Sequence, residues 1–176
     1  GIAGLYARPE VEAAGRDEVE RLFAPTGESL WVEREDDLDA VTALSGSGPA
    51  YVFYFLEAMM QAAAEMFLFA EQGRALALAT FAGATALAAA SDEPPALLRE
   101  RVTSRGGTTF AALSALEAHG VKAAFVDAMK AARRRAQELG AECLDPARDG
   151  VGVVGVEDRG AAAGGVVAGL RLALEE

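Results

Sequence analysis

The chain has 176 residues, the length of one domain or of one domain with a tail. Its formal net charge is −11, and a field of that sign repels phosphate backbones and anionic lipid surfaces. We therefore expect neither a nucleic-acid nor a membrane partner. One of the two longest uncharged stretches, residues 75–91, is rich in Ala and Thr and is shorter than the roughly 20 strongly apolar residues that span a bilayer. Cys143 is the single cysteine, which excludes an internal disulfide and fits a cytoplasmic protein.

Most of the chain has the composition of helix. Alanine is abundant, whereas Val, Ile and Tyr are few by comparison, which favours helix over sheet. Residues 29–33 alternate apolar and polar side chains and predict one short extended segment. The predicted fold class is all-α, a helical bundle. Apolar residues recur at helical spacing in segments that begin near Asp17, Asp36, Pro49, Arg74, Pro95, Phe110 and Val121.

The helix that follows Pro49 stands out by its composition. From Ala50 to Met66 it is hydrophobic nearly all round, apart from Glu57 and Glu65. A helix of that kind is buried, either in a large core or against another subunit. We expect it to lie between subunits.

The character of the chain changes after Gly140. Residues 141–176 have no helical periodicity until a short candidate helix at 166–174, and we interpret them as a weakly specified tail. The tail contains Gly150, Gly152 and Gly155, which formally match GxGxxG. A dinucleotide site needs a strand before that motif and a helix after it, within about 30 residues. The residues before it are no strand and few follow it, so we reject it as a cofactor site.

Two helix starts are rich in Ser and Gly, at residues 45–51 and 104–109. Glycines let the backbone approach a ligand, and the free N–H groups of a first helical turn favour an anion. At 104–109, Thr108 and Thr109 add hydroxyl groups, so a small carboxylate fits there without a lysine. From the spacing alone, an ordinary capped turn is the favoured explanation of either segment.

Other chemistry finds little support in the sequence. His119 is the sole histidine and precedes Gly120 at a helix end, where a cation interacts favourably with the helix dipole. Its predicted role is structural. No cluster of Cys and His residues indicates a metal site, and no catalytic triad can be assembled.

Three stretches, taken together, resemble the pyrroline-5-carboxylate reductase family. They are residues 39–51 (DAVTALSGSGPAY), residues 98–109 (LRERVTSRGGTT) and residues 4–7 (GLYA), which occur in the family's order and spacing. The resemblance covers about residues 1–140, which we take as one helical substrate-binding and dimerisation domain ahead of the tail.

The resemblance implies an oxidoreductase. Family members reduce the cyclic imine 1-pyrroline-5-carboxylate to proline with NADPH or NADH, in proline biosynthesis. The nucleotide is held by an N-terminal Rossmann domain that this chain lacks. The C-terminal domain is all-helical and forms an interwoven homodimer, which assembles further in some members. The implied partners are a small-molecule substrate and further copies of the chain.

The same resemblance assigns roles to residues of the second helix start. Ser104, Gly106, Gly107 and Thr108 correspond to the loop that binds the substrate carboxylate, largely through backbone N–H groups. Thr109 corresponds to the threonine whose hydroxyl meets the ring nitrogen, and is the candidate catalytic residue. A carboxylate held at a helix N-terminus fixes the ring so that its imine carbon faces the nicotinamide.

The sequence departs from the family pattern at two places. Arg105 stands where a proline is usual, which loosens the loop and adds a cation beside the anion site. Residues 67–69 (FLF) replace the usual Gly-Leu-Pro between two long helices, which removes the turn signal and predicts that the helices run together. Two alternatives remain open: a catalytically inactive dimerisation module derived from the family, and an unrelated acidic helical bundle.

Overall fold

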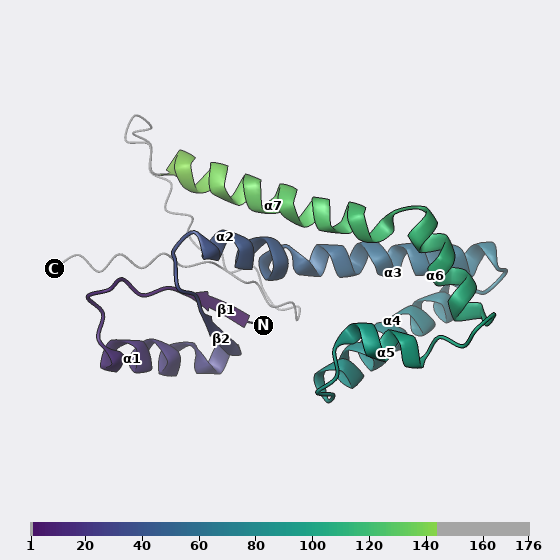
Figure 1. Ribbon diagram of the computed structural model, residues 1–176, viewed down its shortest axis with the longest axis horizontal. Helices are drawn as coiled ribbons and strands as arrows, with labels where there is room; N and C mark the ends of the chain where they lie inside the picture. The colour runs from purple at the N-terminus through teal and green to yellow at the C-terminus, as the bar shows by residue number, and fades with distance from the viewer. Residues whose placement is uncertain (1, 144–176) are drawn as a thin grey trace. The chain divides into compact units, whose positions relative to one another are not determined.

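The structure is a computed structural model that describes residues 2–143. In chain order its elements are β1 (Ile2–Leu5), α1 (Ala13–Phe23), the 3₁₀ turn η1 (Ala24–Thr26), β2 (Glu28–Trp31), α2 (Asp37–Val41), the π-helical turn η2 (Thr42–Gly46), α3 (Gly48–Glu65), α4 (Ala70–Ala89), α5 (Pro95–Arg101), α6 (Thr108–Ala118) and α7 (Val121–Cys143). Figure 1 shows this succession of helices, with the two strands near the N-terminus. The predicted all-α class is confirmed, with a small sheet added to it.

The contacts divide the chain into two compact units, and each is described by itself. Among the described residues, the first contains 2–49 and 127–143, and the second is Ala50–Val126. The helices α3 and α7 each begin in one unit and end in the other. The predicted domain, residues 1–140, and the tail after it are not tested by this division and stay predictions. The GxGxxG motif and the candidate helix at 166–174 lie outside the described residues.

The first unit begins with two parallel strands joined by α1. Ile2 is opposite Glu28 and Leu5 is opposite Trp31, so the pairing is in register along all four residues. The extended segment expected at 29–33 is confirmed as β2, three residues of which fall in that range. The strand β1 was not predicted, because four residues that include a glycine carry no alternating pattern. It forms only because β2 offers hydrogen-bonding partners far along the chain.

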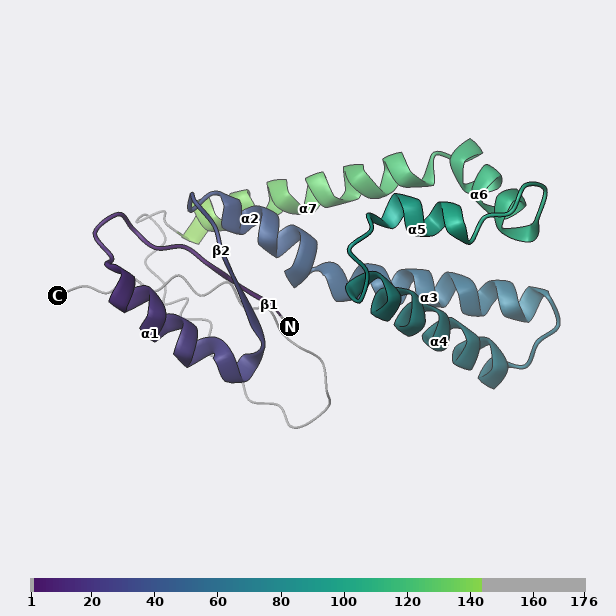
Figure 2. The ribbon, with the colours of Figure 1, turned by 60° about the horizontal axis from the view of Figure 1, so that its bottom comes forward.

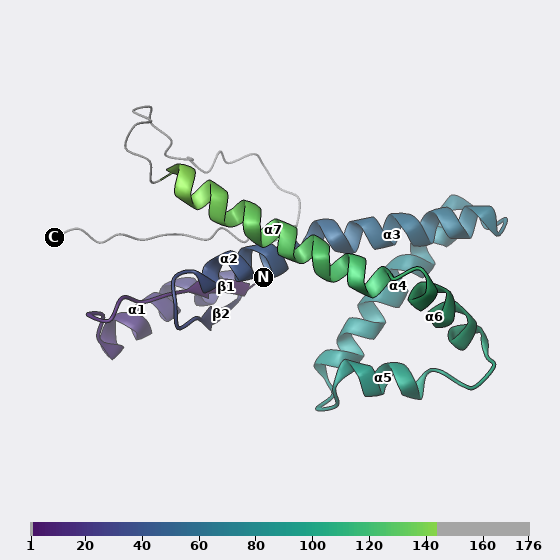
Figure 3. The ribbon, with the colours of Figure 1, turned by 45° about the horizontal axis from the view of Figure 1, so that its top comes forward.

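The second unit is built from a helical hairpin followed by two shorter helices. α3 and α4 leave a common turn as the two arms of the hairpin (Figure 2). Where the arms cross, a Cβ built on Gly73 would lie 2.9 Å from the Cβ of Ala63. A larger residue at either position would therefore force the helices apart. After the hairpin, α5 leads through residues 102–107 into α6 (Figure 3).

The turn between α3 and α4 corrects one prediction. The two helices do not run together: α3 ends at Glu65 and α4 begins at Ala70. Phe67 adopts a left-handed conformation, with φ of 65°. The N–H of Leu68 donates to the carbonyl of Ala63 at 3.0 Å, and the N–H of Phe67 donates to that of Ala64 at 3.0 Å. These two bonds form a Schellman motif, which ends the helix although glycine, its usual residue, is absent.

Little of the described chain is buried. The buried hydrophobic residues are Leu5, Ala43, Ala63 and Ala77, of which only the first is large. Long apolar side chains lie exposed on both arms of the hairpin. Among the described helices, none has the length and hydropathy that crossing a membrane requires. A helical unit with so small a core leaves much of its apolar surface available to another protein surface.

Candidate substrate site at the start of α6

The loop that carries the predicted site begins at the end of α5, where Thr103 donates hydrogen bonds to the last carbonyls of the helix. The hydroxyl of Thr103 donates to the carbonyl of Arg99 at 2.6 Å, and its N–H donates to the carbonyl of Glu100 at 2.9 Å. Both bonds occupy carbonyls at the end of α5 that the helix itself leaves unpaired. Thr103 therefore sets where the loop leaves α5.

The glycine pair in the loop is required by its geometry. Gly106 has φ of 72°, which a residue with a Cβ adopts only with strain. A Cβ built on Gly107 would lie 2.5 Å from Oγ of Ser104 and 3.3 Å from its carbonyl oxygen. The N–H of Gly107 donates to that carbonyl at 3.1 Å. The turn from Ser104 to Gly107 is therefore closed too tightly for larger side chains.

The first turn of α6 leaves N–H groups available. Gly107 is the N-cap residue, in an extended conformation with ψ of 176°, and it has no side chain to cap the helix. Its carbonyl accepts from the N–H of Ala111 at 3.1 Å, the first bond of the helix. The N–H groups of Thr108, Thr109 and Phe110 precede that bond and have no acceptor within the helix. They form a ready site for an anion, since the dipole of an 11-residue helix adds to them.

The polar side chains of the predicted site surround this helix start. Ser104 and Thr108 are exposed, and Thr109 is half-buried. Within the described residues, no hydrogen bond engages the hydroxyls of these three residues. The structure therefore gathers all five predicted site residues on one loop and the first turn that follows it. Arg105 is exposed there too, in the same turn as Gly106.

An ion pair that was not predicted from the sequence lies at the end of α5, next to the loop. Arg101, at the end of α5, pairs with Oε1 of Glu93, and the N–H of Glu93 donates to Oγ of Ser91 at 3.1 Å. The pair joins the segment before α5 to the residue that ends it. A carboxylate eight residues from an arginine gives no helical pairing signal, so only the fold brings them together.

The other Ser/Gly-rich start, at residues 45–51, is built differently. The chain does not break there: α2 continues into the π-helical turn η2, and Ser47 alone separates that turn from α3. The N–H of Ser47 donates to the carbonyl of Thr42 at 2.9 Å. Because Pro49 has no N–H, few donors remain at this start. The helix start expected near Pro49 is confirmed, since α3 begins at Gly48, but a helical turn and not a loop leads into it.

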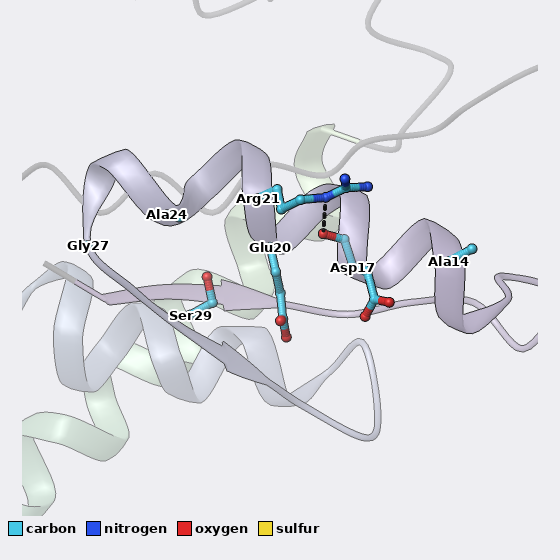
Figure 4. A pocket seen from close by; sticks show the side chains of 7 residues that line it. All are labelled: Ala14, Asp17, Glu20, Arg21, Ala24, Gly27 and Ser29. Atoms are coloured by element: carbon cyan, nitrogen blue, oxygen red, sulfur yellow. Dashed lines mark hydrogen bonds between the residues drawn. The ribbon is translucent and has the colours of Figure 1, made fainter.

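Two hollows in the surface have walls that include none of the five predicted site residues, although Phe110 lines the second. One, of about 810 Å³, lies between α1 and β2 (Figure 4). Arg21, on its wall, donates from Nε to the backbone carbonyl of Asp17 at 3.2 Å, and Glu20 accepts from Nε1 of Trp31 at 2.5 Å. Two of its polar side chains are thus already engaged by other groups of the chain. The second hollow, of about 510 Å³, lies between α5 and α6 and includes Thr103 in its wall, but none of the five predicted site residues.

The chain was compared with families of known proteins. A family described as pyrroline-5-carboxylate reductase dimerisation matches residues 35–139. The chain belongs to the pyrroline-5-carboxylate reductase family. The matched residues include α2 to α6 and most of α7, and with them the loop at 103–107.

Individual reductases of this family agree with the match. A pyrroline-5-carboxylate reductase of Pseudomonas aeruginosa is 43% identical over 139 residues, which are 79% of this chain and 51% of that protein. The structure of a reductase from Coxiella burnetii superimposes with a TM-score of 0.74 at 38% identity, over 78% of this chain and 51% of that one. The structure of Plasmodium falciparum pyrroline carboxylate reductase with NADP bound gives 0.70 at 29% identity, over 78% and 57%. The chain thus spans about half the length of the reductases it matches.

The described residues of this family member do not fit the diphosphate of a nucleotide cofactor. Between residues 2 and 143, the turn from a strand into a helix that such a group needs occurs twice, between β1 and α1 and between β2 and α2. Glu12 is the N-cap of α1 and Asp36 is the N-cap of α2, so an acidic side chain stands at each helix start, where phosphate oxygens would bind. Those residues contain no cluster of three or more metal-binding side chains either.

Proposed function

We propose that this chain supplies the substrate half-site of a pyrroline-5-carboxylate reductase, which reduces 1-pyrroline-5-carboxylate to proline. The observation that carries the proposal is the uncapped start of α6 behind the Gly106–Gly107 turn, in a chain that belongs to this family. Three N–H groups there have no acceptor within the helix, and three hydroxyls lie on the same loop and first turn. This arrangement suits a small carboxylate, and the substrate is a small ring that carries one.

The proposed roles follow from the loop. The substrate carboxylate accepts hydrogen bonds from the free N–H groups of the first turn of α6, with Gly106 and Gly107 allowing its close approach. Ser104 and Thr108 add hydroxyl donors at the rim. With the carboxylate fixed, the ring has one orientation, and its nitrogen meets the hydroxyl of Thr109. Thr109 either gives the imine a proton or holds the protonated imine in place, and both favour hydride addition at the adjacent carbon.

The hydride itself comes from outside the described residues. A reduced nicotinamide, NADPH or NADH, supplies it when bound, and the residues described here do not fit its diphosphate. We infer that the nucleotide is bound by a part corresponding to the half of the longer reductases that this chain does not span. This chain's own contribution is to bind the acid, orient the ring and hold the proton at nitrogen. The predicted cytoplasmic location agrees with the reducing cofactor.

We also propose that the chain works as a homodimer or a larger homo-oligomer. The family match is to a dimerisation domain, and the hairpin exposes apolar side chains along both arms. α4 carries no charge from Ala75 to its end, yet only Gly73 and Ala77 of that helix are buried. An uncharged helix of this length is stable in water only when another surface covers it.

Complementation tests the reductase directly. This chain is mixed with the half of the Pseudomonas aeruginosa reductase that it does not span, and NADPH oxidation is measured with pyrroline-5-carboxylate present. We expect turnover that Thr109→Ala lowers by about 100-fold or more, as is typical of losing a group that handles a proton. Thr109→Ser keeps the hydroxyl and serves as the matched control. A turnover rate that Thr109→Ala leaves unchanged would overturn the role of Thr109.

The second candidate function is a dimerisation module without catalytic activity. It is favoured by the poor fit of the described residues to a nucleotide diphosphate and by the half-length match. The same experiment separates the two. A stable dimer that gives no turnover with the added half, and whose melting temperature does not respond to millimolar proline, would establish the module in place of the enzyme.

A further inference from the structure

The turn between the arms of the hairpin presents two aromatic rings to solvent. Phe67 is 96% exposed and Phe69 is 74% exposed, with Met66 beside them at 66%. Together we call residues 66–69 the hairpin tip. Side chains of this size usually account for much of the apolar area that a protein removes from water. Here they lie exposed at the turn between α3 and α4.

The hairpin tip is held rigidly in this exposed position. Phe67 has φ of 65°, although a residue with a bulky side chain is rarely found in the left-handed region. The two Schellman bonds fix the end of α3 on one side. On the other, Oε1 of Gln72 accepts from the N–H of Phe69 at 2.9 Å, which fixes the start of α4. Rings that are already ordered lose little further freedom when a partner covers them.

The surface next to the hairpin tip indicates the partner. Along α3, Phe53 and Met59 are exposed, and along α4, Leu76 and Leu78 are exposed, so apolar side chains continue from the tip down both arms. All of them lie within residues 35–139, which match a dimerisation domain. A surface that is continuous with the proposed dimer contact is covered by the same partner.

We propose that the hairpin tip docks on a second copy of this chain and that Phe67 and Phe69 anchor the dimer. This inference rests on the homodimer proposed above. Aromatic anchors near the centre of an interface commonly carry much of its binding energy. The left-handed Phe67 then has a physical explanation: the cost of its backbone conformation falls on the free chain, and the contact in the dimer offsets it.

Two substitutions separate folding from docking, because each removes a ring while improving the local backbone. Phe67→Gly relieves the left-handed conformation. Phe69→Ser places a preferred N-cap residue at the start of α4. The matched control is Leu22→Ser, which removes an apolar side chain that is 69% exposed on α1, outside the residues matched to the dimerisation domain.

Sedimentation equilibrium gives the dimer dissociation constant, and denaturant unfolding at low protein concentration gives the stability of the free chain. We expect the double variant Phe67→Gly/Phe69→Ser to raise the dissociation constant at least about tenfold, with an unfolding midpoint at low concentration that is unchanged or higher. We expect Leu22→Ser to leave the dissociation constant unchanged.

A dissociation constant that the double variant leaves as it was would overturn the docking of the tip and leave the dimer standing. If that variant instead weakened binding of the added reductase half, the tip would dock there, and the inference would be wrong. A parent chain that stays monomeric at all concentrations would overturn the homodimer itself.

Discussion

The two Ser/Gly-rich helix starts look alike in sequence and differ in structure. Before α6, the chain makes a closed turn with a left-handed Gly106, and the helix begins with its N–H groups unpaired. Before α3, the chain is already helical, and within the π-helical turn η2 the N–H of Ser47 donates to the carbonyl of Thr42. One start follows a tight loop, whereas the other follows a helical turn and includes Pro49, which has no N–H.

The difference teaches that glycine and serine do not by themselves make an anion site. What decides is whether the residues before the helix turn away from its axis or continue along it. A chain that turns away leaves three or four donors without acceptors, whereas a chain that continues along the axis satisfies them. Four predictions test how far this difference reaches.

The largest effect is expected from Gly106→Ala. With φ of 72°, an added Cβ is strained although open space surrounds it, so the free energy of unfolding should fall by roughly 1–2 kcal/mol. The distorted turn should also lose the rise in melting temperature that millimolar proline gives the parent chain. Denaturant unfolding and thermal melts with and without proline measure both. Unchanged stability would show that this turn is no more constrained than the other helix start.

The next effect separates two serines, one at each start. Ser104→Ala removes a hydroxyl beside the free N–H groups and should weaken the binding of proline by up to about tenfold, since a net hydrogen bond contributes roughly 0.5–1.5 kcal/mol. Ser47→Ala, the matched control, lies where the backbone pairs with itself and should leave binding unchanged. Titration calorimetry measures both. An equal loss in the two variants would erase the distinction between the starts.

A smaller effect is expected from Arg105. A guanidinium beside the N–H groups of α6 adds to the field that attracts a carboxylate, by roughly 0.3–1 kcal/mol at an exposed site. Arg105→Ala should therefore weaken proline binding about two- to fivefold, and Arg105→Glu should weaken it further. High salt should shrink the difference between the variants, because exposed charges are screened. Salt-independent differences would point to a steric cause instead.

The smallest expected effect is on the pH dependence of the free energy of unfolding, through an ion pair at α2, the helix that leads to the other start. The pKa of Asp37, in the first turn of α2, is lowered by hydrogen bonds from Arg34, whose Nη2 donates to Oδ1 at 2.6 Å. Since the folded pKa lies below that of a free aspartate, the pair stabilises the fold above the free value, and its contribution is lost as pH falls through the folded pKa. The stability difference between the parent chain and Arg34→Ala should be small at pH 7 and vanish in acid.

The substitution Arg34→Ala should leave the affinity for proline unchanged. Arg34 and Asp37 belong to the path that leads into α3, not to the loop before α6. Measuring the affinity of Arg34→Ala for proline at pH 7 checks this. A weakened affinity would mean that the two helix starts are coupled.

How much of the site could be predicted depends on how far apart in the sequence the interacting residues lie. The loop at 104–109, its glycine pair and its hydroxyls were identified from the sequence, because they are neighbours in the chain. The Glu93–Arg101 ion pair and the hydrogen bonds by which Thr103 ends α5 were missed, since neither gives a strong signal in the sequence. The turn at residues 67–69 was predicted wrongly, because a left-handed Phe67 runs against the conformational preference of its residue type.

The sequence by itself determined the helices, the end of α6 at His119 and Gly120, and the family to which the chain belongs. These rest on propensities and on hydrogen bonds between residues a few positions apart, so the information is local. Only the tertiary structure decided that Ile2–Leu5 is a strand, that a π-helical turn leads into α3, and that the apolar hairpin has almost no core of its own. Those outcomes depend on hydrogen-bond acceptors and on surfaces that are far apart in the sequence, which no local pattern predicts.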